Sequence, residues 1–283
     1  MARLVESSYG KCGVRLTKVV REGEKHTLIE LAVQIILAGA FDQVYTEADN
    51  SACIPTDTMK NTVYALARSH AFDSPEVFAA ILADHFMEFR QVSQAEVSIE
   101  EEPWARIPTD GGPHPHAFTR GGTGVRTCRL VLQRDGKRRT WAGISGLEVV
   151  KTTRSGFAGF PRDRYTTLAE TTDRIFATSV DAAWEYARAP RSFTSAFDAA
   201  RSCLLACFAG HDSASVQHTI YAMGESLLAR LPEVSEVSIR MPNRHRLPVN
   251  LQPFGLDNPN EIFVATSEPY GLIHGTIARE EGK

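Results

Sequence analysis

Three short segments of the sequence carry side chains that could transfer protons. YGKCGVRLTK places Lys11 at the start of a predicted strand, and IPTDTMKNT places Thr56 and Asp57 where a helix is predicted to begin. MPNRHRLPVN places Asn243 and His245 just after another predicted strand. Lysine and histidine are common general bases, and a hydroxyl can pass a proton between a base and a substrate.

Each of these residues also has a structural interpretation. A lone lysine on a strand is usually a solvated charge, and Thr56 or Asp57 could simply cap the helix. Asn243 and His245 are two residues apart, so they would face the same side if the strand continued. A lone histidine, however, is more often structural than catalytic. Taken one by one, these residues do not establish a function.

Several other kinds of site are not predicted by the sequence. It has no GxGxxG after a strand, no phosphate loop, no HExxH and no CxxC, and the glycine run RGGTG precedes a strand rather than a helix. His114 and His116 could pair on a metal, but no third ligand lies nearby in the sequence, so a solvated loop is expected. We therefore expect no metal site.

Composition excludes further classes of protein. The 283 residues carry a formal charge of −3, which does not suggest a nucleic-acid or membrane partner. The longest apolar stretch, 31–40, is far shorter than the ~20 residues of a membrane span. The five cysteines are not spaced for a disulfide framework, and Cys203 and Cys207 fit buried free thiols. The N-terminus lacks the pattern of a signal peptide and the final EEGK is not a peroxisomal address, so a cytoplasmic location is expected.

Hydrophobic periodicity predicts an α+β protein built from two similar halves, 1–135 and 136–283. Each half reads as a strand pair, a helix pair and a strand pair, and AEVSI (95–99) is echoed by SEVSI (235–239). Predicted strands cover 14–20, 26–37, 92–107, 117–133, 137–152, 172–184, 234–241 and 261–267, and predicted helices cover 56–69, 75–86, 192–208 and 213–231. The TDGGPHPH segment reads as a loop.

Such halves leave open sheet edges. Four antiparallel strands with helices on one face expose unpaired backbone groups at both ends of the sheet, and only closure removes them. We therefore expect a homo-oligomer in which sheets from different chains close into a β-barrel.

Five stretches, taken together and in this order, resemble the urate oxidase family over nearly the whole chain. They are YGKCGVRLTK, PTDTMKNTVYALA, SGFAGFPRDRYTTLAETTDRI, SVQHTIYAMG and MPNRHRLPVNL. The resemblance implies the tunnelling fold (T-fold), with two similar halves per chain, a barrel from two chains and two stacked barrels in a homotetramer. It also implies oxidation of urate by dioxygen and water to 5-hydroxyisourate and hydrogen peroxide, without a cofactor.

The resemblance assigns proton transfer to three residues. Lys11 and Thr56 match the family's proton-relay dyad, and His245 matches the third member, which touches the lysine. Thr56 and Asp57 would reach the site from a neighbouring subunit, which places the sites at subunit interfaces.

The resemblance assigns the remaining residues to substrate binding. Phe157 would stack on the purine, Arg174 and Gln217 would grip its polar edges, and Val216 would lend a backbone N–H. Asn243 would hold the small-molecule site above the ring. Ala158 departs from the family, since many members carry a larger residue there, and this bears on the breadth of the pocket.

Physical chemistry supports these residue types. A flat anionic purine needs an aromatic face, a planar cationic fork and an amide that both donates and accepts hydrogen bonds. Phe157, Arg174 and Gln217 supply these three features. The alternatives are a salt bridge of Arg174 with Asp173 or Glu170, and core packing for one ring of the pair Phe157 and Phe160.

Two other functions remain open from the sequence. A pterin-processing enzyme on the same fold would usually carry a zinc site or a glutamate where Gln217 stands. A non-catalytic purine-binding assembly protein would keep the binding residues but lose Lys11, Thr56 and His245. The residues present favour urate oxidation.

Overall fold

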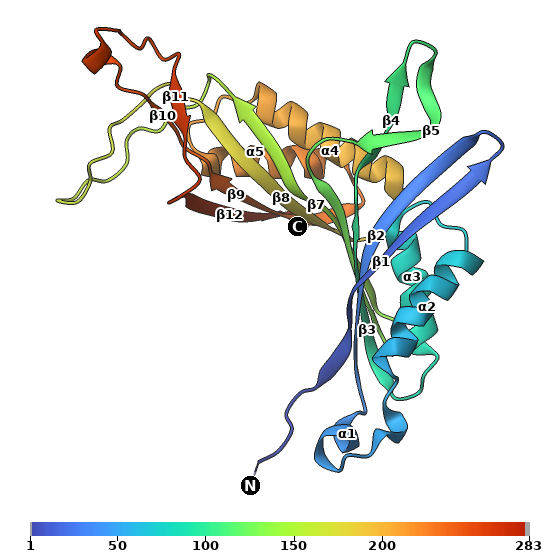
Figure 1. Cartoon of the computed structure of the whole chain (residues 1–283). Coiled ribbons are helices and arrows are strands. Elements are labelled where there is room, and N and C mark those ends of the chain that lie inside the picture. Colours follow the sequence, from blue (N-terminus) through green and yellow to red (C-terminus); the bar gives the residue numbers. More distant parts are fainter. Residues whose placement is uncertain (1, 281–283) are drawn as a thin grey trace. The chain divides into compact units, whose positions relative to one another are not determined.

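The computed structural model describes residues 2–280 and shows two compact units (Figure 1). The first unit extends to Gly143 and includes Glu185–Ser195; the second comprises Ile144–Trp184 and the residues from Ala196 onward. The predicted division of the chain between 135 and 136 stays a prediction. Of the EEGK segment, the last three residues lie outside the described part.

The first unit is an antiparallel sheet with helices against it. The order of the strands is β1-β2-β3-β6, and helix α3 packs on β3 and β6 while α2 packs on β1. The elements are β1 (Ser8–Glu22), β2 (Lys25–Gly39), α1 (Asp42–Thr46), the 3₁₀ turn η1 (Asn50–Ala52), α2 (Thr56–Ser69), α3 (Pro75–Met87), β3 (Val92–Glu101), β4 (Trp104–Thr109), β5 (Gly112–Arg120) and β6 (Val125–Gln133).

The alternation of buried side chains along β2 explains how this sheet packs against its helices. Val33, Ile35 and Leu37 are all buried and point to one face, as expected for a period of two. They belong to the same apolar cluster as Met59 and Val63, which lie one helical turn apart on α2. Burial of these side chains is the main stabilising contribution to the unit.

The structure corrects the predicted strands 92–107 and 117–133. Each of them is split in two, and β4 and β5 form a separate two-stranded hairpin. His114 and His116 lie on β5 rather than in a loop, with their ring centroids 4.6 Å apart. Pro108, Pro113 and Pro115 obscure the strand pattern here because proline disfavours regular strands. The described residues contain no group of three or more potential ligands that could hold a metal ion.

The second unit repeats this plan. Its strand order is β7-β8-β9-β12, where β7 and β8 also contribute residues to the first unit, and α5 packs on β9 and β12. The elements are β7 (Arg138–Lys151), β8 (Phe176–Tyr186), α4 (Phe193–Gly210), α5 (Val216–Arg230), β9 (Val234–Asn243), β10 (Arg246–Pro248), the 3₁₀ turn η2 (Gln252–Phe254), β11 (Phe263–Ala265) and β12 (Gly271–Ala278).

The last strand of this sheet differs from the prediction. Residues 261–267 were expected to complete the sheet, but β11 pairs only with β10, and β12 pairs antiparallel with β9 instead. Gly275 explains why β12 can lie there, because a Cβ at this position would come within 3.0 Å of Ile220 on α5. Glycine weakens strand patterns in sequence, which is why this strand was missed. Among the described helices, none is long and apolar enough to span a membrane.

Candidate functional site

A cavity of about 740 Å³ in the second unit collects the candidate binding residues. Its size falls in the range of roughly 300–1,000 Å³ typical of small-molecule sites. The candidate residues on its wall come from three separate segments: the loop after β7, the start of α5, and the end of β9 with the residues that follow it. The candidate residues on its wall are Phe157, Arg174, Val216, Gln217, Asn243 and His245.

The Phe157 loop is held by backbone pairing. Phe157 N donates to Thr171 O at 2.8 Å, and Thr171 N donates back to Phe157 O at 3.0 Å. Gly156 permits this close pairing, since a Cβ there would lie 3.1 Å from Thr171 O. Phe160 stacks on Phe157 with centroids 4.9 Å apart and rings 13° from parallel. Phe157 lines the cavity and Phe160 supports it, so the two rings have different roles.

Arg174 has an unusual electrostatic environment. Its guanidinium makes no hydrogen bond or ion pair with any residue in 2–280, so neither expected salt bridge forms. Asp173 instead accepts a hydrogen bond from Thr153 Oγ1 at 2.7 Å, and Glu170 lies 4.0 Å from Arg162. Burial lowers the pKa of Arg174. A half-buried cation without a counter-ion favours an anionic ligand.

The N-terminus of α5 supplies hydrogen-bond donors to the same cavity. Ser215 caps the helix, since its Oγ accepts from His218 N at 3.1 Å. The backbone N–H groups of Val216 and Gln217 have no acceptor in the described part of the chain. They also lie at the positive end of the helix dipole, which favours an anion.

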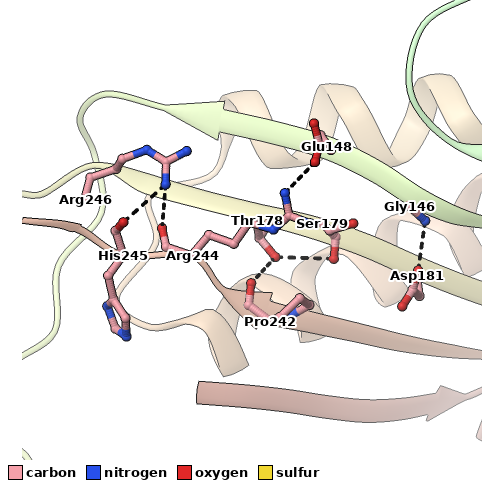
Figure 2. A network of polar contacts seen from close by, with 9 residues as sticks. All are labelled: Gly146, Glu148, Thr178, Ser179, Asp181, Pro242, Arg244, His245 and Arg246. Atoms are coloured by element: carbon pink, nitrogen blue, oxygen red, sulfur yellow. Dashed lines mark hydrogen bonds and ion pairs between the residues drawn. The ribbon is translucent and has the colours of Figure 1, made fainter. Parts of the chain in front are cut away.

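The end of β9 and the residues that follow it are fixed by polar contacts (Figure 2). Thr178 Oγ1 donates to Pro242 O at 2.8 Å, and Arg244 forms an ion pair with Glu148. The carbonyl oxygen of His245 accepts from Arg246 Nη1 at 3.2 Å. These bonds engage the backbone and the neighbouring side chains.

The polar contacts around the end of β9 leave the imidazole of His245 and the side-chain amide of Asn243 without a partner among residues 2–280. Both side chains lie on the cavity wall. They are therefore available to a ligand.

Lys11, Thr56 and Asp57 lie together in the first unit. A bulge after Lys11, with Gly13 at φ +68°, shifts the register of β1 against β2. Asp57 is paired with Lys60, which together with a smaller contribution from the charge of Lys11 lowers the pKa of Asp57. The start of α2 has no side-chain cap, so Thr56 does not act as one. Its hydroxyl has no partner within the described residues.

Tyr9 holds the start of α2 close to β1. Its hydroxyl accepts a hydrogen bond from Ile54 N at 2.7 Å, two residues before Thr56. Burial is the main reason that the pKa of Tyr9 is raised to about 12, so the phenol stays neutral. The roles of Lys11, Thr56 and Asp57 in a common site with the cavity stay a prediction.

Sequence reasoning missed several residues of the cavity wall. They include Asn260, Glu261 and Phe263, which follow a turn built by Asn258. Asn258 Oδ1 accepts from Glu261 N and Ile262 N, both at 3.0 Å. The DNPN sequence signals such a turn, but nothing in it indicates that the turn meets a binding site.

Comparison with known proteins decides the family. A family model described as uricase matches residues 7–131 and 140–274. The chain belongs to the uricase family. The predicted resemblance and the predicted α+β fold are thereby confirmed, and every candidate residue lies within the matched ranges.

Individual uricases agree with this assignment. The uricase of Arthrobacter globiformis is 44% identical over 278 residues, which cover 98% of this chain and 90% of the relative. The uricase of Oryctolagus cuniculus is 38% identical, covering 98% and 94%. The crystal structure of uricase from Arthrobacter globiformis matches with a TM-score of 0.95 and 43% identity, covering 100% of this chain and 97% of that one.

Proposed function

We propose that this chain oxidises urate with dioxygen and water to 5-hydroxyisourate and hydrogen peroxide, without a metal or flavin. The observation that carries the proposal is the convergence of three distant segments of a uricase-family chain on one cavity, with the uncompensated Arg174 on its wall. Urate is a flat anion with hydrogen-bonding edges, and it fits this combination of groups.

The proposed binding mode uses each group for a different part of the purine. Phe157 stacks on the ring, which contributes ~0.5–1.5 kcal/mol beyond burial. Arg174 forms charge-assisted hydrogen bonds with one edge. Gln217 bonds with its amide, and Val216 donates its backbone N–H to the same edge of the anion.

The proposed chemistry begins with removal of a proton from bound urate. Lys11 acts as the base and Thr56 carries the proton between lysine and substrate, with His245 adjusting the relay. General-base catalysis of this kind contributes typically ~10²–10⁴-fold. The electron-rich dianion passes electrons to dioxygen, and a water held by Thr56 and Asn243 attacks the oxidised ring.

The proposed site is shared between subunits of a homotetramer. Thr56 and Asp57 of one chain would complete the cavity of another. Open sheet edges support this assembly, because β1 and β12 each have a partner on only one side among the described strands. Exposed apolar side chains near the C-terminus, such as Phe254 and Leu256, support it as well. The free cysteines agree with a cytoplasmic location.

A direct assay tests this function. Purified protein should bleach the near-ultraviolet absorbance of urate and release one peroxide for each urate consumed. Activity should persist after exhaustive chelation and without added flavin. Bleaching without peroxide, or activity lost on chelation and restored by metal, would contradict the proposal.

A further inference from the structure

Two buried hydroxyls, those of Ser213 and Thr219, lie beside the N-terminus of α5 and do not line the cavity. Ser213 is 4% exposed and Thr219 is 0% exposed. Their oxygens are 2.7 Å apart and share a hydrogen bond. Both also lie within hydrogen-bonding distance of Ser215 O, at 3.0 Å and 3.2 Å. The pair therefore ties Thr219, in the first turn of α5, to Ser213, which lies two residues before the cap Ser215.

Ser213 also ties this helix end to the aromatic loop. Gly156 N donates to Ser213 O at 2.8 Å, and Ser213 N donates to Arg154 O at 3.0 Å. Phe157 follows directly and is itself paired with Thr171. An unbroken series of hydrogen bonds thus runs from Thr219 through Ser213 to the backbone next to Phe157.

The two ends of this series carry two different contacts of the proposed site. Phe157 offers a ring face, whereas Val216 and Gln217 offer donors directed at an edge of the same flat ligand. Hydrogen bonds tolerate only a few tenths of an ångström, from about 2.7 to 3.2 Å between heavy atoms. A bound purine can meet both contacts only when the Phe157 loop and the N-terminus of α5 keep a fixed offset, that is, a fixed position relative to each other.

We propose that the Ser213–Thr219 hydroxyl pair is a positioning device that sets this offset and thereby determines affinity for the purine. Neither residue touches the ligand, since neither lines the cavity. Two buried hydroxyls fix a direction as well as a distance, which an apolar pair cannot do. The inference rests on the proposed binding of urate in this cavity.

The test replaces Thr219 with two variants of opposite kind. Thr219→Val keeps the branched shape and removes the hydroxyl, whereas Thr219→Ser keeps the hydroxyl and removes the methyl. Titration with urate under anaerobic conditions measures binding without turnover. For Thr219→Val we expect the Kd to rise about tenfold, the cost of roughly one hydrogen bond. We expect KM to follow and kcat at saturation to stay within about twofold, because the reacting groups are untouched.

Thr219→Ser should bind urate as the wild type does. Ile220→Val is the matched control, because it removes one methylene from the neighbouring buried position and leaves the hydroxyls in place. It should lower the melting temperature slightly and leave the Kd unchanged. If Thr219→Val does not fold, Ser213→Ala replaces it, with the same expected rise in Kd.

The outcomes separate this inference from the proposed function. Wild-type protein that neither binds nor oxidises urate would refute the function itself. Active wild type with an unchanged Kd in a folded Thr219→Val or Ser213→Ala variant would refute the positioning role alone. A rise in Kd that Thr219→Ser shares to the same extent would also refute it, since the hydroxyl would then be irrelevant.

Discussion

At the scale of single residues, a half-buried arginine without a counter-ion marks the site. Desolvating a cation costs free energy unless a partner repays it. Arg174 lies over the Phe157 ring, 5.6 Å from its centroid, but has no counter-ion within residues 2–280. Several other arginines form ion pairs, for example Arg154 with Asp212 and Arg240 with Asp181. The cost at Arg174 is offset when an anion binds.

Arg174→Ala should weaken urate binding by ~1.5–3 kcal/mol, the scale of a hydrogen bond to a charged group. The melting temperature should stay the same or rise, because the free protein loses an unpaired, half-buried charge. Anaerobic titration and thermal unfolding measure the two effects. Arg162→Ala is the control on an exposed arginine and should bind normally; equal loss in both variants would contradict the assignment.

Lys11→Met should lower turnover by about 10²–10⁴-fold, because it removes the proposed base. Urate binding should remain nearly intact, since Lys11 is assigned to proton transfer. Lys18→Met is the control on the same strand. Lys18 donates to Ala67 O and His70 O, both at 2.7 Å, so its loss should lower stability and spare turnover. Normal turnover in Lys11→Met would mean that the relay is wrongly assigned.

At the scale of elements, a polar side chain links three strands of the second unit. Asp181 on β8 accepts from Gly146 N on β7 at 2.9 Å and from Arg240 Nη2 on β9 at 3.0 Å (Figure 2 shows the first contact). It therefore ties together three strands that lead toward the cavity residues. Burial alone would raise the pKa of Asp181, but these hydrogen bonds and the charge of Arg240 outweigh it, so the pKa is lowered.

This shift predicts how stability depends on pH. Because the folded pKa of Asp181 lies below its ordinary value of 3.8, its contribution is fully present above that value and is lost as the pH falls through the folded pKa. Asp181→Asn should therefore lower the free energy of unfolding at neutral pH, and the difference from wild type should shrink in acid. Urea unfolding of both proteins at neutral pH and in acid measures the difference in the free energy of unfolding.

Asp84→Asn serves as the control for that experiment. Asp84 pairs with Arg138 on the surface, where its side chain is 57% exposed, and such pairs contribute little. A difference for Asp181→Asn that grew in acid would contradict the predicted sign.

At the scale of the whole molecule, the proposed site needs two copies of the chain. The cavity residues belong to the second unit and Lys11, Thr56 and Asp57 to the first. An isologous arrangement would let the first unit of one chain serve the second unit of its partner.

Complementation tests this arrangement. At a urate concentration far below the raised KM of Arg174→Ala, Thr56→Ala and Arg174→Ala should each be nearly inactive alone. Co-expressed, they should recover up to about one quarter of wild-type activity, because random pairing in a symmetric assembly builds that share of intact sites. The control mixes the two purified variants just before the assay, without time for exchange. Activity no greater than the sum of the two variants would place each site within one chain, and light scattering would report the assembly mass.

Local signals in the sequence determined helices α2 and α3 of the first unit and the residue types of the site. Helix α2 spans the predicted 56–69, and α3 begins at the predicted residue 75. Ser74 caps it and Pro75 is its first residue, because capping and proline preferences act over a few residues. The motifs likewise pointed to Phe157 and Arg174, which line the cavity.

Only the tertiary structure decided which distant groups meet and which stay unpaired. Strand β12 depends on β9, a partner far away in the chain. In the β4–β5 hairpin and in β12, proline and glycine hide the strand pattern. Among the described residues, the free hydroxyl of Thr56, the missing counter-ion of Arg174 and the contact of Ser213 with Thr219 likewise depend on neighbours in space. Sequence determines which chemical groups are available, whereas burial and partner choice arise only when the chain has folded around them.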